Sequence, residues 1–125
     1  IGGVRTTIAR SEENYKAVEN WVAKTDWAEF LCEKPENRSR TSVCLKITDH
    51  WFSQLEDQQG FIKSMTKLLD SEGVAYDIAG YRDAPAGLRI WCGATVQGSD
   101  VEALMPWLDW AYKTAKAEEE RKKAA

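Results

Sequence analysis

The sequence predicts an α+β domain: a two-layer sandwich in which a mostly antiparallel sheet of about four strands has helices packed on one face. Two patterns predict this class. Segments with apolar residues at helical spacing open the chain, divide it and close it, and pairs of short segments rich in β-forming residues lie between them. The predicted order is helix, strand, strand, helix, strand, strand, helix, in one domain of 125 residues.

The first two helices are predicted from apolar spacing and from residues that start or stop a helix. Residues 4–24 are expected to form one helix, although Ser11 offers an N-cap for a shorter one. Residues 60–73 contain the second helix, and Gly73 stands where a helix-terminating glycine belongs.

The last helix is expected to open at Ser99, which can form a capping box with Glu102. Its charged end, residues 117–125, is expected to fray. The residues predicted to face the core from the three helices are Val4, Ile8, Tyr15, Val18, Trp21, Val22, Phe61, Ile62, Met65, Leu68, Leu69, Val101, Leu104, Leu108, Ala111 and Tyr112.

Four strands are predicted, near residues 30–32 and over residues 42–48, 74–81 and 87–93. The last two are joined by the turn DAPAG. Since side chains alternate across a strand, the final strand is expected to turn one set toward the helices and the other away from them. The first set is Leu88, Ile90 and Cys92, and the second is Arg89 and Trp91.

Composition excludes several classes of function. The net charge of −3, from 17 basic and 20 acidic side chains, argues against nucleic acid as a partner. No apolar run is long enough to cross a membrane, so no membrane partner is expected. The three cysteines and the single histidine, His50, lack the spacing of a zinc site. Reduced thiols in a cytoplasmic protein are the simplest interpretation, and Cys92 is predicted to be buried and inert.

The candidate site is the predicted hairpin, GYRDAPAGLRIWCGATV (residues 80–96). Arg89 places a permanent cation inside an apolar strand, where its guanidinium could bind a carboxylate in a bidentate manner. The alternative is a solvated arginine on the open face of the sheet. Tyr81 and Arg82 end the preceding strand and offer a hydroxyl and a cation to an anion, or they simply flank a turn.

Three blocks of the chain, RTSVCLKITD, GVAYDIAGYRDAPAGLRIWCGATV and DVEALMPWLDWAY, resemble the C-terminal part of the phosphoserine aminotransferases. The resemblance implies a homodimeric, pyridoxal-phosphate-dependent enzyme of fold type I. Such an enzyme exchanges an amino group between glutamate and 3-phosphohydroxypyruvate, giving 2-oxoglutarate and phosphoserine in serine biosynthesis. The resemblance also implies that Arg89 binds the substrate α-carboxylate. It places Arg82 near the substrate phosphate, whereas Tyr81 stands where part of the family has histidine.

The resemblance further implies that the chain is a small C-terminal domain, residues 1–125, with residues 1–24 as the helix that leads in from a large domain. The chain opens with Ile1 rather than Met, which agrees with a fragment. No cofactor-binding lysine is recognised, since Lys46, Lys63 and Lys67 are predicted to lie on the surface. The fragment alone is therefore expected to be inactive. It is expected to contain no catalytic, cofactor-binding or metal-binding residues.

Two expectations follow for the isolated domain. It should expose an apolar patch around Trp21, Trp27 or Trp91, where a second domain would pack. The alternative hypothesis is a free-standing α+β module that binds an anionic metabolite at the same hairpin.

Overall fold

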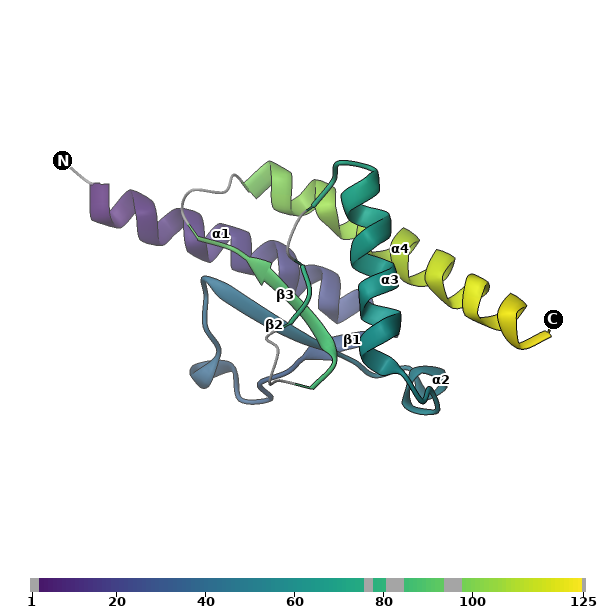
Figure 1. Cartoon of the computed structure of the whole chain (residues 1–125). Helices are drawn as coiled ribbons and strands as arrows, with labels where there is room; N and C mark the ends of the chain where they lie inside the picture. The colour runs from purple at the N-terminus through teal and green to yellow at the C-terminus, as the bar shows by residue number, and fades with distance from the viewer. Residues whose placement is uncertain (1–2, 76–77, 81–84, 94–97, 125) are drawn as a thin grey trace.

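The computed structural model describes residues 3–75, 78–80, 85–93 and 98–124 (Figure 1). Its elements follow the predicted order except that two short elements are added and the strand predicted over residues 74–81 is not among them. They are α1 (Gly3–Lys24), β1 (Ala28–Phe30), a single 3₁₀ turn η1 (Pro35–Asn37), β2 (Ser42–Ile47), α2 (His50–Ser53), α3 (Gln58–Ser71), β3 (Gly87–Trp91) and α4 (Gly98–Ala124).

The described strands form an antiparallel sheet in the order β1-β2-β3. The α+β class is confirmed, but about four strands were expected and three are found. Where residues 74–81 were predicted to form a strand, the described part makes one isolated bridge, between Ala79 and Leu88. Two backbone hydrogen bonds flank this bridge, from Arg89 N to Ile78 O (2.7 Å) and from Gly80 N to Gly87 O (3.0 Å). The described residues 78–80 therefore lie beside β3 without forming a strand of their own.

The helices gather on one side of the sheet (Figure 1). α1 contacts β1, α3 contacts β3, and α4 packs against both of these helices. One face of the sheet is buried beneath them, through Ala28, Phe30, Val43, Leu45, Leu88 and Ile90. The buried hydrophobic residues form one cluster that the sheet and the helices share. The expectation of helices packed on one face is confirmed.

The helix boundaries confirm some predictions and correct others. α1 is the long helix, and Ser11 lies inside it. Gly73 has a positive φ of 68° and follows Glu72, the C-cap residue of α3. Its N–H bonds to Asp70 O and the next N–H, of Val74, bonds to Leu69 O, which is the Schellman arrangement. Ser99 is the second residue of α4 rather than its N-cap.

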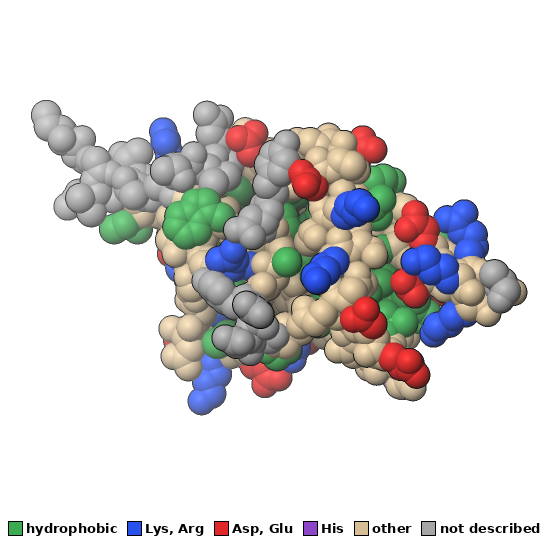
Figure 2. Space-filling model, viewed as in Figure 1, with side chains coloured by type: hydrophobic (Ala, Val, Ile, Leu, Met, Phe, Trp, Pro, Cys, Tyr) green, Lys and Arg blue, Asp and Glu red, His purple; other side chains and the backbone are tan. Residues whose placement is uncertain are grey.

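The charged C-terminal segment is helical to Ala124, although it was expected to fray. Figure 2 shows acidic and basic side chains mixed over this end of α4. Three basic residues fall in its last turn, where cations stabilise the helix dipole; they are Arg121, Lys122 and Lys123.

Most of the predicted core is buried, with a few corrections. Ile8 was expected in the core but is 58% exposed. The predicted core residues that are only partly buried are Trp21, Val22, Leu68 and Leu104, and the side chain of Val4 lies outside the described part. Of the tryptophans expected in an exposed patch, Trp91 is 54% exposed, whereas Trp27 is 5% exposed. Trp27 is buried because its indole N–H donates to Asp109 (2.8 Å) and its ring stacks on Tyr112, 4.2 Å between centroids.

Asp49 ties the start of α2 to α4. Its carboxylate accepts hydrogen bonds from the backbone N–H of Trp51 (3.2 Å), from the hydroxyl of Tyr112 (2.5 Å) and from the ammonium of Lys116 (2.9 Å). These donors, the Tyr112 hydroxyl first, hold the pKa of Asp49 below its ordinary value. The turn after β2 is therefore fixed by a carboxylate rather than by apolar packing alone.

Asn14 ties α1 to the end of β3. Its side chain is fully buried, and its amide nitrogen donates to the carbonyl oxygens of Cys92 and Gly93, each at 3.2 Å. The two carbonyls follow the last residue of β3, where pairing within the sheet ends. A buried amide that satisfies two carbonyls in this way fixes how the helix lies across the strand.

Replacing Asn14 by leucine should lower the free energy of unfolding by about 2 to 3 kcal/mol, because two buried carbonyls lose their donor. Urea unfolding followed by circular dichroism measures it. The control is Asn20→Leu, an exposed position on the same helix, where a change within about 0.5 kcal/mol is expected. Equal losses for the two variants would contradict the assignment.

Candidate functional site

The open face of the sheet carries the predicted site. Leu88, Ile90 and Cys92 are buried, Arg89 is partly buried and Trp91 is exposed, so the predicted alternation along β3 is confirmed. The register of β2 against β3 pairs Cys44 with Arg89 and Ser42 with Trp91. A cation, an indole, a thiol and a hydroxyl-bearing residue therefore share one part of this face.

Backbone hydrogen bonds define how closely Cys44 and Arg89 approach. The carbonyl of Cys44 accepts from Leu31 N (2.9 Å), on the β1 side, and the N–H of Arg89 donates to Ile78 O, away from β2. Across β2 and β3 the two residues therefore form a non-hydrogen-bonded pair. In such pairs the Cα atoms lie ~4.5 Å apart and the side chains are closest.

Arg89 and Trp91 also line a hollow of about 540 Å³ at the edge of β3. Its other walls are mostly apolar, from Val74, Ala75, Ile78, Ile90, Val101 and Leu104, with Asp100 at the first turn of α4. The indole of Trp91 lies over Gly93, where an added Cβ would come 2.4 Å from the ring. Glycine at position 93 thus gives Trp91 the space that it occupies.

The other two predicted site residues, Tyr81 and Arg82, lie outside the described residues. Their proximity to Arg89 therefore stays a prediction. The described part of the hairpin ends at Gly80 on one side and resumes at Pro85 on the other. Gly80 N bonds to Gly87 O across this gap, so the two described ends are adjacent.

Gly87 has a role that the sequence prediction missed. A Cβ at this position would come 2.2 Å from the carbonyl oxygen of Leu45, so any larger residue would force β3 away from β2. Glycine therefore permits the close pairing of the two strands, and it leaves no side chain on the open face two positions before Arg89.

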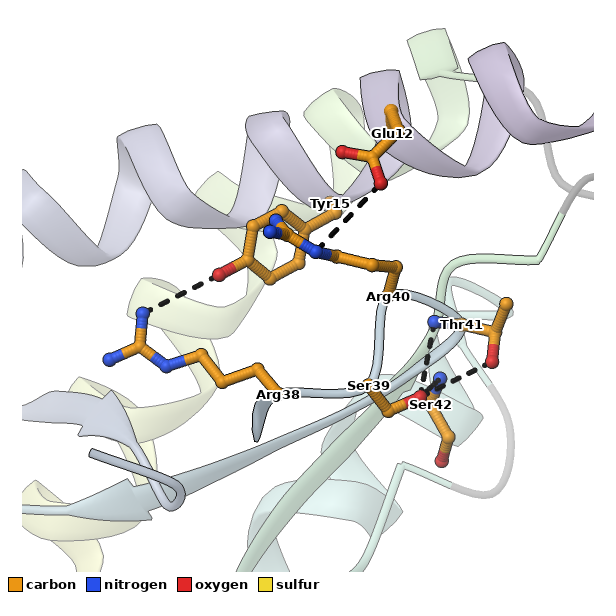
Figure 3. A network of polar contacts seen from close by, with 7 residues as sticks. All are labelled: Glu12, Tyr15, Arg38, Ser39, Arg40, Thr41 and Ser42. Atoms are coloured by element: carbon orange, nitrogen blue, oxygen red, sulfur yellow. Dashed lines mark hydrogen bonds and ion pairs between the residues drawn. The ribbon is translucent and has the colours of Figure 1, made fainter. Parts of the chain in front are cut away.

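The polar segment that leads into β2 is anchored to α1 (Figure 3). Arg40 forms an ion pair with Glu12, 3.8 Å from Nε to Oε1, and its guanidinium lies 4.1 Å from the centre of the Tyr15 ring. Arg38 donates to the hydroxyl of Tyr15 (3.4 Å) and to the carbonyl of Cys32 (2.6 Å).

Ser39 completes this anchor. Its hydroxyl oxygen accepts from the backbone N–H of Thr41 (3.3 Å) and of Ser42 (3.1 Å), which fixes the turn before β2 (Figure 3). The sign of this anchor in the sequence was a pair of arginines separated by one residue, between a proline and a β-strand. Their partners on α1, Glu12 and Tyr15, lie more than twenty positions away, and no local pattern identifies them.

Burial distinguishes the thiols, all three of which are free. Burial raises the pKa of Cys92 to about 11, so this thiol is protonated at neutral pH and the prediction of an inert cysteine is supported. Partial burial also raises the pKa of Cys44, and the positive charge of Arg89 opposes that rise. The guanidinium is therefore close enough to act on the Cys44 sulfur.

The lysines that the sequence analysis considered lie at the surface of the described part. Lys46 is paired with Glu33 (3.3 Å) on β2, and Lys63 and Lys67 are exposed on α3, as predicted for surface lysines. His50 is exposed at the start of α2. Within the described ranges, no three His, Cys, Asp or Glu side chains are grouped as metal ligands. None of the described helices is both apolar enough and long enough to span a membrane.

Curated relatives confirm the resemblance seen in the sequence. The chain is 47% identical over 116 residues to the phosphoserine aminotransferases of Methanosarcina mazei and Methanosarcina barkeri, and these alignments cover 93% of the chain. The chain spans about 29% of the length of each relative. No family model matches it.

Solved structures share the fold. A phosphoserine aminotransferase from Bacillus circulans subsp. alkalophilus superposes with a TM-score of 0.63 over 83% of this chain and 26% of that one, at 15% sequence identity. A second one, solved in a study of radiation damage to its Schiff base, gives a TM-score of 0.62 over 85% of this chain and 27% of that one, at 14% identity. The α+β architecture therefore matches part of a phosphoserine aminotransferase.

The three thiols should react at very different rates with iodoacetamide. Cys32 and Cys44, which are partly exposed, are expected to be labelled in the native protein, whereas Cys92 stays unmodified because it is buried and protonated. Mass spectrometry of tryptic peptides measures this, with labelling in urea as the control for complete reaction. Fast native labelling of Cys92 would show that the end of β3 is not packed against α1 as described.

Proposed function

We propose that this chain is the substrate-binding C-terminal domain of a phosphoserine aminotransferase. The enzyme would transfer an amino group between glutamate and 3-phosphohydroxypyruvate, yielding 2-oxoglutarate and phosphoserine for serine biosynthesis. The observation that carries the proposal is the 47% identity to two such enzymes over 93% of the chain. The matching fold and the cation on the open face of the sheet support it.

In this proposal Arg89 binds the α-carboxylate of the substrate. A guanidinium forms two parallel hydrogen bonds with a carboxylate, so it fixes the orientation of the amino acid as well as its position. Arg89 is suited to this role because β3 is paired with β2 on one side and bonded to the Ile78–Gly80 segment on the other. A rigid strand loses less entropy on binding than a loop does.

Arg82 is proposed to contact the substrate phosphate, and Tyr81 to lie beside it. These roles rest on the resemblance of the hairpin sequence to the family and on its place before Pro85. A phosphate and a carboxylate at the two ends of one small substrate require two separate cations, and the hairpin offers both within eight positions of the chain.

Pyridoxal phosphate would supply the transamination chemistry, and we propose that residues beyond this chain hold it. The lysines Lys46, Lys63 and Lys67 lie on the surface of the described part, with no pocket of cofactor-binding groups around them. This domain contributes substrate binding and orientation, and the domain alone would be inactive.

We also propose that the full enzyme is a homodimer in the cytoplasm, where glutamate, phosphoserine and their keto acids are its small-molecule partners. Three free thiols and the lack of any disulfide among the described residues agree with a reducing compartment. The exposed Trp91, beside Arg89 on the open face, agrees with a surface that the rest of the enzyme covers.

The alternative is a free-standing module that binds an anionic metabolite in the hollow beside Arg89. The hollow of about 540 Å³ is large enough for a small carboxylic acid. The coding sequence upstream of Ile1 separates the two proposals: a long open frame with a cofactor-binding lysine supports the aminotransferase, and a start codon immediately upstream supports the module.

The carboxylate role predicts the kinetics of Arg89 variants in the full-length enzyme. Arg89→Gln should raise the KM for glutamate about 100-fold, since a charge-assisted, bidentate contact is lost. Arg89→Lys should recover part of this loss because it keeps the charge but not the fork geometry. Steady-state transamination assays measure both, and wild-type KM values for both variants would remove Arg89 from the site.

A further inference from the structure

Two of the three free thiols belong to one hollow in the surface. Cys32 and Cys44 are partly exposed, and both line a hollow of about 390 Å³ beside β2. Its other walls are formed by Phe30, Leu31, Arg38, Ser39, Ser42 and Val43. The proposed substrate contacts use neither thiol, and the anchor of the loop before β2 uses only the backbone carbonyl of Cys32. Two soft ligand groups that share a hollow can hold an ion that neither would hold alone.

The backbone brings these two cysteines close together. Leu31 N donates to Cys44 O (2.9 Å), which continues the pairing of Phe30 with Leu45 one step beyond the end of β1. Cys32 is the next residue, and consecutive Cα atoms lie ~3.8 Å apart. Because β1 ends at Phe30, strand alternation does not force the side chain of Cys32 onto the face opposite Cys44.

The number of ligand groups selects the class of ion. Within the described ranges, no group of three His, Cys, Asp or Glu side chains forms around these thiols. A structural zinc site needs four ligands and a catalytic one three from the protein, so two thiols are too few for zinc. Cu(I) is a soft ion that thiolates select, and two thiolates complete a linear coordination. A bridging ion also spans sulfurs that lie farther apart than the ~2.05 Å of a disulfide bond.

The charge in the hollow suits such a complex. Two thiolates and one Cu(I) carry a net charge of −1, and Arg38 lines the same hollow. Its guanidinium donates to the carbonyl of Cys32 (2.6 Å) and to that of Glu33 (3.0 Å), and it lies 4.0 Å from the centre of the Phe30 ring. A cation that is already held beside Cys32 stabilises the added negative charge without having to move.

We propose that Cys32 and Cys44 form a two-coordinate site for Cu(I). The inference goes beyond the proposed aminotransferase function and does not depend on the role of Arg89. Binding forms two Cu–S bonds and releases both thiol protons to the buffer, and the copper stays in the +1 state, so no oxidant or reductant is consumed. The Cys32 thiol gives up its weak hydrogen bond to the carbonyl of Lys34 (3.5 Å) when it loses its proton.

Anaerobic titration of this chain with Cu(I), in competition with bicinchoninate, measures the stoichiometry and the affinity. One ion per chain is expected. Cys32→Ser and Cys44→Ser should each lower the affinity more than about 100-fold, which exceeds the loss caused by removing an outer-shell partner. Cys92→Ala, at the buried thiol, is the control and should bind one ion with wild-type affinity.

Thiol protection provides a second measurement, on the unchanged sequence. One equivalent of Cu(I) should slow the reaction of Cys32 and of Cys44 with iodoacetamide together, by at least about tenfold, because a metal-bound sulfur is a poor nucleophile. Cys92 should stay unlabelled with and without the ion. One equivalent of Zn²⁺ should leave the labelling of both exposed thiols unchanged, since the site offers only two ligands.

Three outcomes would overturn the site. They are protection of only one of the two cysteines, wild-type affinity in either serine variant, and binding of two Cu(I) ions per chain at separate thiols. Zn²⁺ binding as tight as that of Cu(I) would also overturn it, because it requires ligands beyond Cys32 and Cys44. Circular dichroism reports that each variant is folded before its affinity is compared.

Discussion

The register of β2 against β3 determines which side chains lie on the open face of the sheet. It places Leu45 opposite Leu88 and Val43 opposite Ile90 on the buried face, so the alternating positions bring Cys44 opposite Arg89 on the other. A slip of β3 by one residue would bury the guanidinium beneath the helices and expose Leu88 and Ile90. Burying a cation without a partner costs several kcal/mol, so the hydrophobic core and the position of Arg89 are fixed by the same pairing.

Three sets of contacts prevent such a slip. The amide of Asn14 holds the two carbonyls that follow β3, so the strand cannot move along its own axis without losing buried hydrogen bonds. At the start of β2, Arg38 and Arg40 rest against Tyr15 on the same helix (Figure 3). At Gly87, the absent Cβ permits an approach to Leu45 that no other residue allows. Both strands that form the open face, β2 and β3, are thus held in place by contacts with α1.

Local patterns in the sequence were sufficient for most of the fold and for the orientation of Arg89. Helical spacing identified α1, α3 and α4, and the period of two along β3 separated Arg89 from Leu88 and Ile90. Those patterns depend on neighbours within a few positions. The contacts of Asn14 and Trp27 join residues about eighty positions apart, and a polar or aromatic residue on a charged helix gives no sign of them. The strand expected over residues 74–81 is not found in the described part of that segment, which makes one isolated bridge. The β-forming residues there predict a conformation but not the length over which a neighbouring strand pairs with it.

In the proposed function this domain would hold the carboxylate of a substrate, and residues beyond the chain would supply the transamination chemistry. Binding an amino acid needs a fixed cation, which a paired strand supplies better than a loop. Transamination would also need a cofactor, and the three lysines that the sequence analysis considered are at the surface, with Lys46 paired with Glu33 and Lys63 and Lys67 exposed. Arg89 and the exposed Trp91 lie on the face of the sheet opposite the buried one, and both line the hollow that α4 also borders through Asp100, Val101 and Leu104. In the proposed enzyme a second domain would close over this face and exclude water. A charge-assisted contact between Arg89 and the substrate carboxylate would be strongest under those conditions.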